Sequence, residues 1–122
     1  MASQQPSEGD EMDPDPEDVK IITLARSTRA RVSASEGAAV RDETGRTYAA
    51  AAVSLPSLRL SALRLAVAMA ASSGATNLAA AAWVSDADAP DPGDIAAVRD
   101  LGPAAVVINA APDGTIRSTH TA

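Results

Sequence analysis

The stretch from Leu58 to Gly74, LRLSALRLAVAMAASSG, constrains the fold of this chain more than any other segment. It is almost wholly apolar apart from Arg59 and Arg64, whereas a helix on a protein surface keeps a broad polar side. Ser57 can cap the start of a helix here, and Gly74 can end it. The stretch therefore predicts a buried helix at the centre of one small domain.

The composition predicts a thin hydrophobic core. The chain has 122 residues with one Trp, one Tyr, no Phe and no Cys, and alanine is its main apolar residue. Alanine buries little area, so Leu, Ile and Val must supply most of the hydrophobic free energy, at about 25 cal/mol per Å². Such a core favours stabilisation by self-association. The lack of cysteine excludes disulfides and thiolate zinc sites.

The formal net charge of −6 is unevenly distributed. Residues 1–14 are polar and acidic, so we expect a disordered tail, followed by a domain over residues 15–119. Residues 120–122, with the single histidine His120, are expected to fray. The N-terminus does not resemble a secretory signal, and Arg59 and Arg64 argue against membrane insertion of the central helix. We therefore expect a cytoplasmic protein with no membrane partner.

A first helix is expected from Asp15 to about Val32, because Asp15 can cap it and Pro16 suits its first turn. Ile21, Ala25, Thr28 and Val32 would lie along one side of it. Its basic residues would lie on the other sides and offer a candidate patch for RNA, although a solvated surface is the simpler interpretation. This patch would consist of Lys20, Arg26, Arg29 and Arg31.

The rest of the chain alternates between expected strands and helices. A hairpin over Gly37–Arg41 and Arg46–Val53 turns at Gly45, and the central helix follows it. A buried strand is expected over Leu78–Val84, a helix capped by Asp94 over Asp94–Leu101, a central or parallel strand over Ala104–Asn109, and an edge strand over Thr115–Thr119. The order α-β-β-α-β-α-β predicts an α/β three-layer sandwich with one mixed sheet.

This order, with several short motifs, resembles the cytidine deaminase family from about Val19 to Ile116. Gly37–Val40 with Gly45–Tyr48 is similar to the family's first two strands. Ser61-Ala62-Leu63-Arg64 is similar to its Cys-Ala-Glu-Arg helix start. Asp100–Pro103 leading into Val106–Asn109 resembles the segment that leaves its third helix.

The resemblance implies zinc chemistry for which this chain lacks residues. Family members hold zinc with a Cys or His and two further Cys, and a glutamate moves the protons. Here Ser61 takes the place of the first ligand and Leu63 that of the glutamate. The family's Pro-Cys-Gly-x-Cys loop falls within Pro90–Ile95, where Pro90, Asp91, Pro92, Gly93 and Asp94 offer no thiol in any register. We therefore expect no cofactor.

Two further features bear on function. Ala52–Leu55 replaces the family's Asn-Val-Glu-Asn stretch, which binds the nucleoside sugar. The carboxylates of Asp86, Asp88, Asp91 and Asp94 are irregularly spaced and do not form an EF-hand pattern, so a solvated loop with helix caps is expected rather than a site for a hard metal.

We interpret the chain as a catalytically inactive, cytidine deaminase-like protein that acts through contacts with itself or with another macromolecule, a protein or RNA. By resemblance it is expected to form a homodimer or homotetramer through the central helix. Two alternatives remain open. One is an active deaminase with non-standard ligands. The other is an RNA- or ribosome-associated accessory protein that uses the basic first helix.

Overall fold

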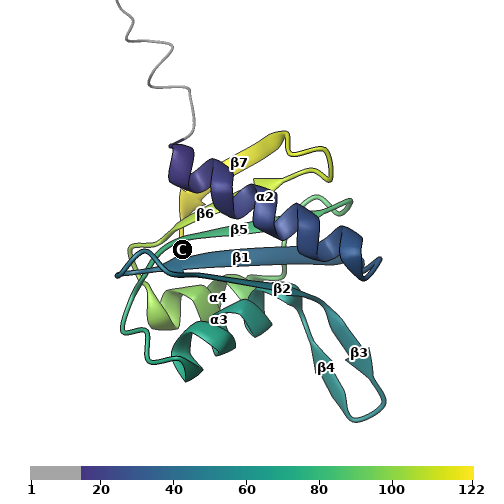
Figure 1. Cartoon of the computed structure of the whole chain (residues 1–122), viewed down its shortest axis with the longest axis horizontal. Coiled ribbons are helices and arrows are strands. Elements are labelled where there is room, and N and C mark those ends of the chain that lie inside the picture. The colour runs from purple at the N-terminus through teal and green to yellow at the C-terminus, as the bar shows by residue number, and fades with distance from the viewer. Residues whose placement is uncertain (1–14) are drawn as a thin grey trace, which may run out of the picture.

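The computed structural model describes residues 15–122, which form a mixed five-stranded sheet with helices on both faces (Figure 1). The strand order is β2-β1-β5-β6-β7. Helix α2 covers one face, and α3 and α4 cover the other. This confirms the predicted α/β class and the mixed sheet. The predicted disordered tail, residues 1–14, lies outside the described residues. The elements are α2 (Pro16–Arg31), β1 (Glu36–Asp42), β2 (Thr47–Ala51), β3 (Val53–Leu55), β4 (Leu58–Leu60), α3 (Ala62–Ser72), β5 (Leu78–Ser85), α4 (Pro92–Leu101), β6 (Val106–Ala110) and β7 (Ile116–Thr121).

Strand β5 lies in the middle of the sheet and joins its two halves. It pairs antiparallel with β1 and parallel with β6. Strand β6 pairs antiparallel with the edge strand β7. Residues 107–110 of β6 are all buried, as expected for a strand covered on both faces. The prediction of a central or parallel strand is confirmed by the parallel pairing of β6 with β5, and the predicted edge position of the last strand is confirmed as well.

The sheet separates two cores, each rich in alanine. One lies under α3 and α4 and includes Leu63, Leu78 and Trp83. The other lies under α2 and includes Ile21, Ile22 and Ile108. The indole N–H of Trp83 is buried and has no hydrogen-bond partner among the described residues. The buried alanines of β5, residues 80–82, let both helical layers approach the sheet closely, because their side chains are short.

Helix α2 begins as predicted, with one difference in its buried side. The Asp15 side chain accepts a hydrogen bond of 2.8 Å from the Glu17 amide, which confirms the cap. Ile21, Ala25 and Thr28 are buried, together with Ile22. The prediction that Val32 continues this side is wrong, because the helix ends at Arg31 and Val32 is exposed.

The central helix begins later than predicted, which corrects both its start and its burial. Residues 58–60 form β4, so Ser57 is not the cap; Ser61 is, and α3 runs over Ala62–Ser72. Only Ala62, Leu63, Ala66 and Ala70 are buried. The helix therefore packs one side against the sheet and leaves another apolar side open, instead of being buried all round.

Several other boundaries differ from prediction. Helix α4 starts at Pro92 with Asp91 at the N-cap position, so Asp94 lies in its first turn and is not the cap. Strand β2 ends at Ala51. The expected fraying of residues 120–122 is wrong, because β7 continues to Thr121 and the Ala122 amide donates a hydrogen bond of 2.9 Å to the carbonyl of Ala105.

A small hairpin of β3 and β4 was not predicted. It projects from the body of the domain beyond α3 and β2 (Figure 1). Its leucines Leu55 and Leu58 are exposed. An isolated two-stranded hairpin gains little from its own packing.

The turn between β1 and β2 is held by the carboxylate of Asp42. It accepts hydrogen bonds from the amides of Thr44 and Arg46 and from the hydroxyls of Thr44 and Tyr48, at 2.7–3.0 Å. Burial alone would raise the pKa of Asp42, but these hydrogen bonds outweigh it and lower the pKa from 3.8 to about 2. The adjacent Gly45 has a φ of 90°, which confirms the predicted turn glycine.

Gly37 on β1 is where helix α2 comes closest to the sheet. A Cβ at this position would overlap the carbonyl of Ala25 and lie 2.8 Å from the Cβ of Arg29. The backbone of β1 thus lies directly against α2.

No helix within residues 15–122 is long and apolar enough to span a membrane.

Candidate functional site

The N-termini of α3 and α4 meet at a contact between Ser61 and Asp94. The Ser61 hydroxyl donates a hydrogen bond of 2.9 Å to Oδ1 of Asp94. The same hydroxyl oxygen accepts a hydrogen bond of 3.2 Å from the Arg64 amide, as an N-cap does. Ser61 therefore uses its hydroxyl both as the cap of α3 and as a link to α4.

Arg64 supplies the positive charge for the buried carboxylate of Asp94. Its Nε lies 2.9 Å from Oδ1 of Asp94, and the exposed fractions of the two side chains are 51% and 5%. The guanidinium also lies over Gly93, where a Cβ would overlap Nη2 of Arg64. The carboxylate is thus paired with a cation and further hydrogen-bonded, which is what a buried charge requires. We call Ser61, Arg64 and Asp94 the junction triad.

Two neighbours of the junction triad complete the start of α3. The Ala62 amide donates a hydrogen bond of 2.9 Å to the carboxylate of Glu36 on β1, which places a negative charge at the positive end of the helix. Leu63 is fully buried in the apolar core that also contains Trp83. The position at which the family resemblance implies a proton-carrying glutamate is therefore part of the core.

The residues at this junction do not fit a zinc ion. Oδ1 of Asp94 already contacts the guanidinium of Arg64, and that positive charge opposes a second cation beside it. Ser61 donates its only hydroxyl proton to the same oxygen and offers a neutral oxygen in place of a thiolate. In the loop Pro90–Asp94, Asp94 is paired with Arg64 and Asp91 stands at the N-cap position of α4.

The acidic loop before α4 is tied to other parts of the chain. Oδ2 of Asp86 lies 3.2 Å from Nη2 of Arg29. The backbone carbonyl of Asp88 accepts a hydrogen bond of 2.5 Å from the side-chain amide of Asn109. The guanidinium of Arg117 donates to the backbone carbonyls of Asp86 and Ala87. Across the part of the chain that the structure describes, no group of three or more His, Cys, Asp or Glu side chains is placed to hold a metal ion.

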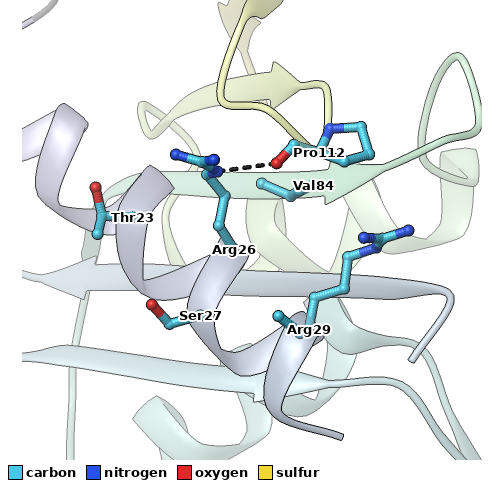
Figure 2. A pocket seen from close by; sticks show the side chains of 7 residues that line it. Thr23, Arg26, Ser27, Arg29, Val84 and Pro112 are labelled. Carbon is cyan, nitrogen blue, oxygen red and sulfur yellow. Dashed lines mark hydrogen bonds between the residues drawn. The ribbon is translucent and has the colours of Figure 1, made fainter. Parts of the chain in front are cut away.

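A second candidate site lies on the opposite face of the sheet. A pocket of about 360 Å³ opens between α2, the end of β5 and the turn that follows β6 (Figure 2). Nε of Arg26 donates a hydrogen bond of 2.9 Å to the carbonyl of Pro112. Arg26 and Arg29 extend from α2 on either side of Val84. The pocket is lined by Thr23, Arg26, Ser27, Arg29, Ala30, Val84 and Pro112.

The predicted basic patch is therefore only partly gathered in one place. Arg26 and Arg29 line the pocket, whereas Lys20 and Arg31 are exposed and do not. Arg29 is also engaged by Asp86 and donates a hydrogen bond of 3.3 Å to the carbonyl of Ser35.

Sequence reasoning missed several residues at the two sites. Arg64 and Glu36 were not assigned roles, and neither were Val84 and Pro112. No local signal existed for any of the four, since their roles depend on which helices and strands become neighbours.

Comparisons with known proteins agree with this architecture. A family model described as cytidine deaminase-like matches residues 14–114. The cytidine deaminase from Burkholderia pseudomallei is similar in structure, with a TM-score of 0.74 and 23% identity over 84% of this chain and 90% of that chain. The cytidine deaminase from Mycobacterium leprae gives a TM-score of 0.66 and 19% identity over 88% and 94% of the two chains. No curated protein matches the sequence. At these identities the structural similarity supports the fold.

Proposed function

Because the chain belongs to the cytidine deaminase-like family, we propose that it is a member without deaminase activity that acts as an interaction module and self-associates through α3. The junction triad carries this proposal. Zinc-dependent deamination needs an open coordination position and a nearby proton carrier. At the start of α3 this chain has an ion pair between Arg64 and Asp94, and a leucine in the core.

The segment before α3 gives independent support. Residues 52–55, the stretch that replaces the family's sugar-binding motif by resemblance, lead into and form β3. Ser54 and Leu55 are exposed on the projecting hairpin and bring neither a carboxylate nor an amide side chain. A nucleoside sugar would therefore find none of the acceptors that this stretch supplies in the family.

The outer side of α3 supports self-association. Leu65, Ala68 and Met69 form a shallow hollow of about 390 Å³ together with Tyr48, Ser72 and Ser73. Met69 is 37% exposed. The single charge of the helix, Arg64, is paired at its first turn, so the outer side carries no charge of its own. An uncharged apolar surface of this kind packs against a second copy of itself without placing like charges together.

The absence of activity is tested by native mass spectrometry of the purified protein after incubation with zinc, and by measuring conversion of cytidine to uridine. We expect no bound zinc and no uridine above the uncatalysed rate. One zinc ion per chain, or turnover of cytidine, would contradict the proposal and support the active-deaminase alternative.

Self-association is tested by sedimentation velocity at micromolar concentration. We expect a dimer or tetramer that Met69→Lys shifts towards the monomer, because the substitution places a charge in the apolar surface. Val32→Lys is the matched control, since Val32 is an exposed apolar residue at the end of α2. A monomeric parent protein, or an equal effect of the two substitutions, would contradict an interface on α3.

A further inference from the structure

The pocket between α2 and the β6–β7 turn has the donors of an anion site. Thr23, Arg26, Ser27 and Ala30 follow one another at a spacing of three or four residues, so they share one side of α2. This side faces the carbonyl of Pro112 across the pocket, and the buried Val84 forms its floor. Figure 2 shows the two guanidinium groups on the side of α2 that faces Val84 and Pro112, whereas the hydroxyls of Thr23 and Ser27 point away from them.

The hydrogen-bond donors of the pocket differ in whether they already have an acceptor within the described chain. Nε of Arg26 is fixed by Pro112, and among residues 15–122 no acceptor contacts its two terminal nitrogens. This bond holds the guanidinium plane in place while its N–H groups remain available. The Ser27 hydroxyl likewise has no partner within the described chain, whereas that of Thr23 donates to the carbonyl of Val19. Arg26 is therefore the preorganised donor of this pocket, whereas nothing in the described chain fixes the hydroxyl of Ser27.

Two carboxylates border the pocket and limit what fits. Asp86 pairs with Arg29 through an exposed side chain. Hydrogen bonds from Thr115 lower the pKa of Asp113, and the charge of Arg26 lowers it further. A ligand anion must displace Asp86 or share Arg29 with it. A long polyanion would also have to pass close to both carboxylates.

We propose that this pocket binds the phosphate group of a small soluble molecule, held by the guanidinium groups of Arg26 and Arg29, which are neighbours at a spacing of three on α2. Guanidinium groups match phosphate oxygens in geometry and charge. The volume of about 360 Å³ lies near the lower end of typical ligand pockets. RNA fits less well, because Lys20 and Arg31 lie outside the pocket and Trp83 is buried away from bases.

The test is an NMR titration of the full chain with inorganic phosphate and with pyrophosphate, against sodium chloride at matched ionic strength. We expect amide shifts confined to α2, residues 84–86 and residues 112–114 that saturate with the phosphates but not with chloride. Shifts that chloride reproduces, or no saturable shift with either phosphate, would overturn the proposal.

Three variants sharpen the test. Arg26→Gln keeps a donor for Pro112 but loses the charge, and it should weaken phosphate binding about tenfold or more. Ser27→Glu adds a carboxylate at an exposed helix position and should abolish binding even if Arg26→Gln perturbs the fold. Arg31→Gln removes an exposed cation of the same helix outside the pocket and should change nothing. Equal losses for Arg26→Gln and Arg31→Gln would overturn the site. So would a short RNA that binds more tightly than pyrophosphate and loses affinity equally in both variants.

Discussion

The hydroxyl of Ser61 on α3 and the carboxylate of Asp94 on α4 are joined by a hydrogen bond of 2.9 Å. The two residues are far apart in the sequence, yet each lies at the start of its helix. The bond therefore fixes the two helix N-termini relative to each other at the place where the family resemblance implies a metal. This hydrogen bond and the ion pair of Arg64 with Asp94 connect the two helices through side chains alone.

Arg64→Ala should destabilise the fold by about 1–3 kcal/mol, because it leaves a buried carboxylate without its cation. Urea unfolding measures the effect. Arg59→Ala is the control, since Arg59 is an exposed arginine on β4 without an ion pair among the described residues. If both variants lose the same stability, the pairing of Arg64 with Asp94 contributes nothing measurable.

The effect of Gly93→Ala on the free energy of unfolding should depend on whether Arg64 is present. Alanine in place of a helical glycine ordinarily stabilises by roughly 0.5–1 kcal/mol. Here the new Cβ would overlap the Arg64 guanidinium and push it from Asp94. We expect destabilisation or no gain in the parent chain and a gain in the Arg64→Ala chain. Equal effects in both backgrounds, measured by the same urea unfolding, would disprove the coupling.

Acid should weaken the β1–β2 turn through Asp42. The folded pKa of about 2 lies below the ordinary value of 3.8, so the folded state binds the proton more weakly than the unfolded state does. The stabilisation is therefore fully present above pH 3.8 and is lost as the pH falls through about 2. Comparison with Asp42→Asn by urea unfolding isolates this residue, because other acidic groups also titrate in this range. The difference in the free energy of unfolding between the parent chain and Asp42→Asn should become smaller as the pH falls through this range. A difference that does not change with pH would argue against the role of Asp42.

Glu36→Ala should cost about 1 kcal/mol, because the Ala62 amide would lose its acceptor and α3 would lose the negative charge at its N-terminus. Glu36→Gln keeps an acceptor of the same length without the charge, so its loss should be smaller. Thermal unfolding of the two variants gives the comparison. A glutamine variant as unstable as the alanine variant would show that the hydrogen bond is not the source of the effect.

The sequence was most informative where the structure depends on neighbouring residues. Asp15 and Pro16 predicted the start of α2, Gly45 predicted the first turn, and the apolar run before Asn109 predicted the buried strand β6. In each case the deciding contacts lie within a few residues. The start of α3 shows the limit. Ser57 and Ser61 are both suitable caps, and the choice depends on Asp94 and Glu36, which only the fold brings near.

At both candidate sites, the sequence located some of the residues but not the contacts between them. Ser61, Leu63 and the loop around Asp94 were located by resemblance, and Arg26 and Arg29 by their spacing on one helix. Neither route predicted that Arg64 would pair with Asp94 or that Pro112 would close a pocket over Arg26. Both contacts join elements that are distant in the chain, and they depend on helix packing and strand order.

The absence of a side chain at Gly37 has a consequence for the pocket beside α2, because Gly37 pairs across the strands with Val84, which lines that pocket. A methyl group there would act as a wedge against Ala25 and Arg29. It would push α2 and Arg29 away from the sheet while leaving the chemical identity of every residue that lines the pocket unchanged. The glycine at position 37 thus sets the distance between α2 and the sheet. A substitution there should change the affinity of the pocket for phosphate, although Gly37 itself does not line the pocket.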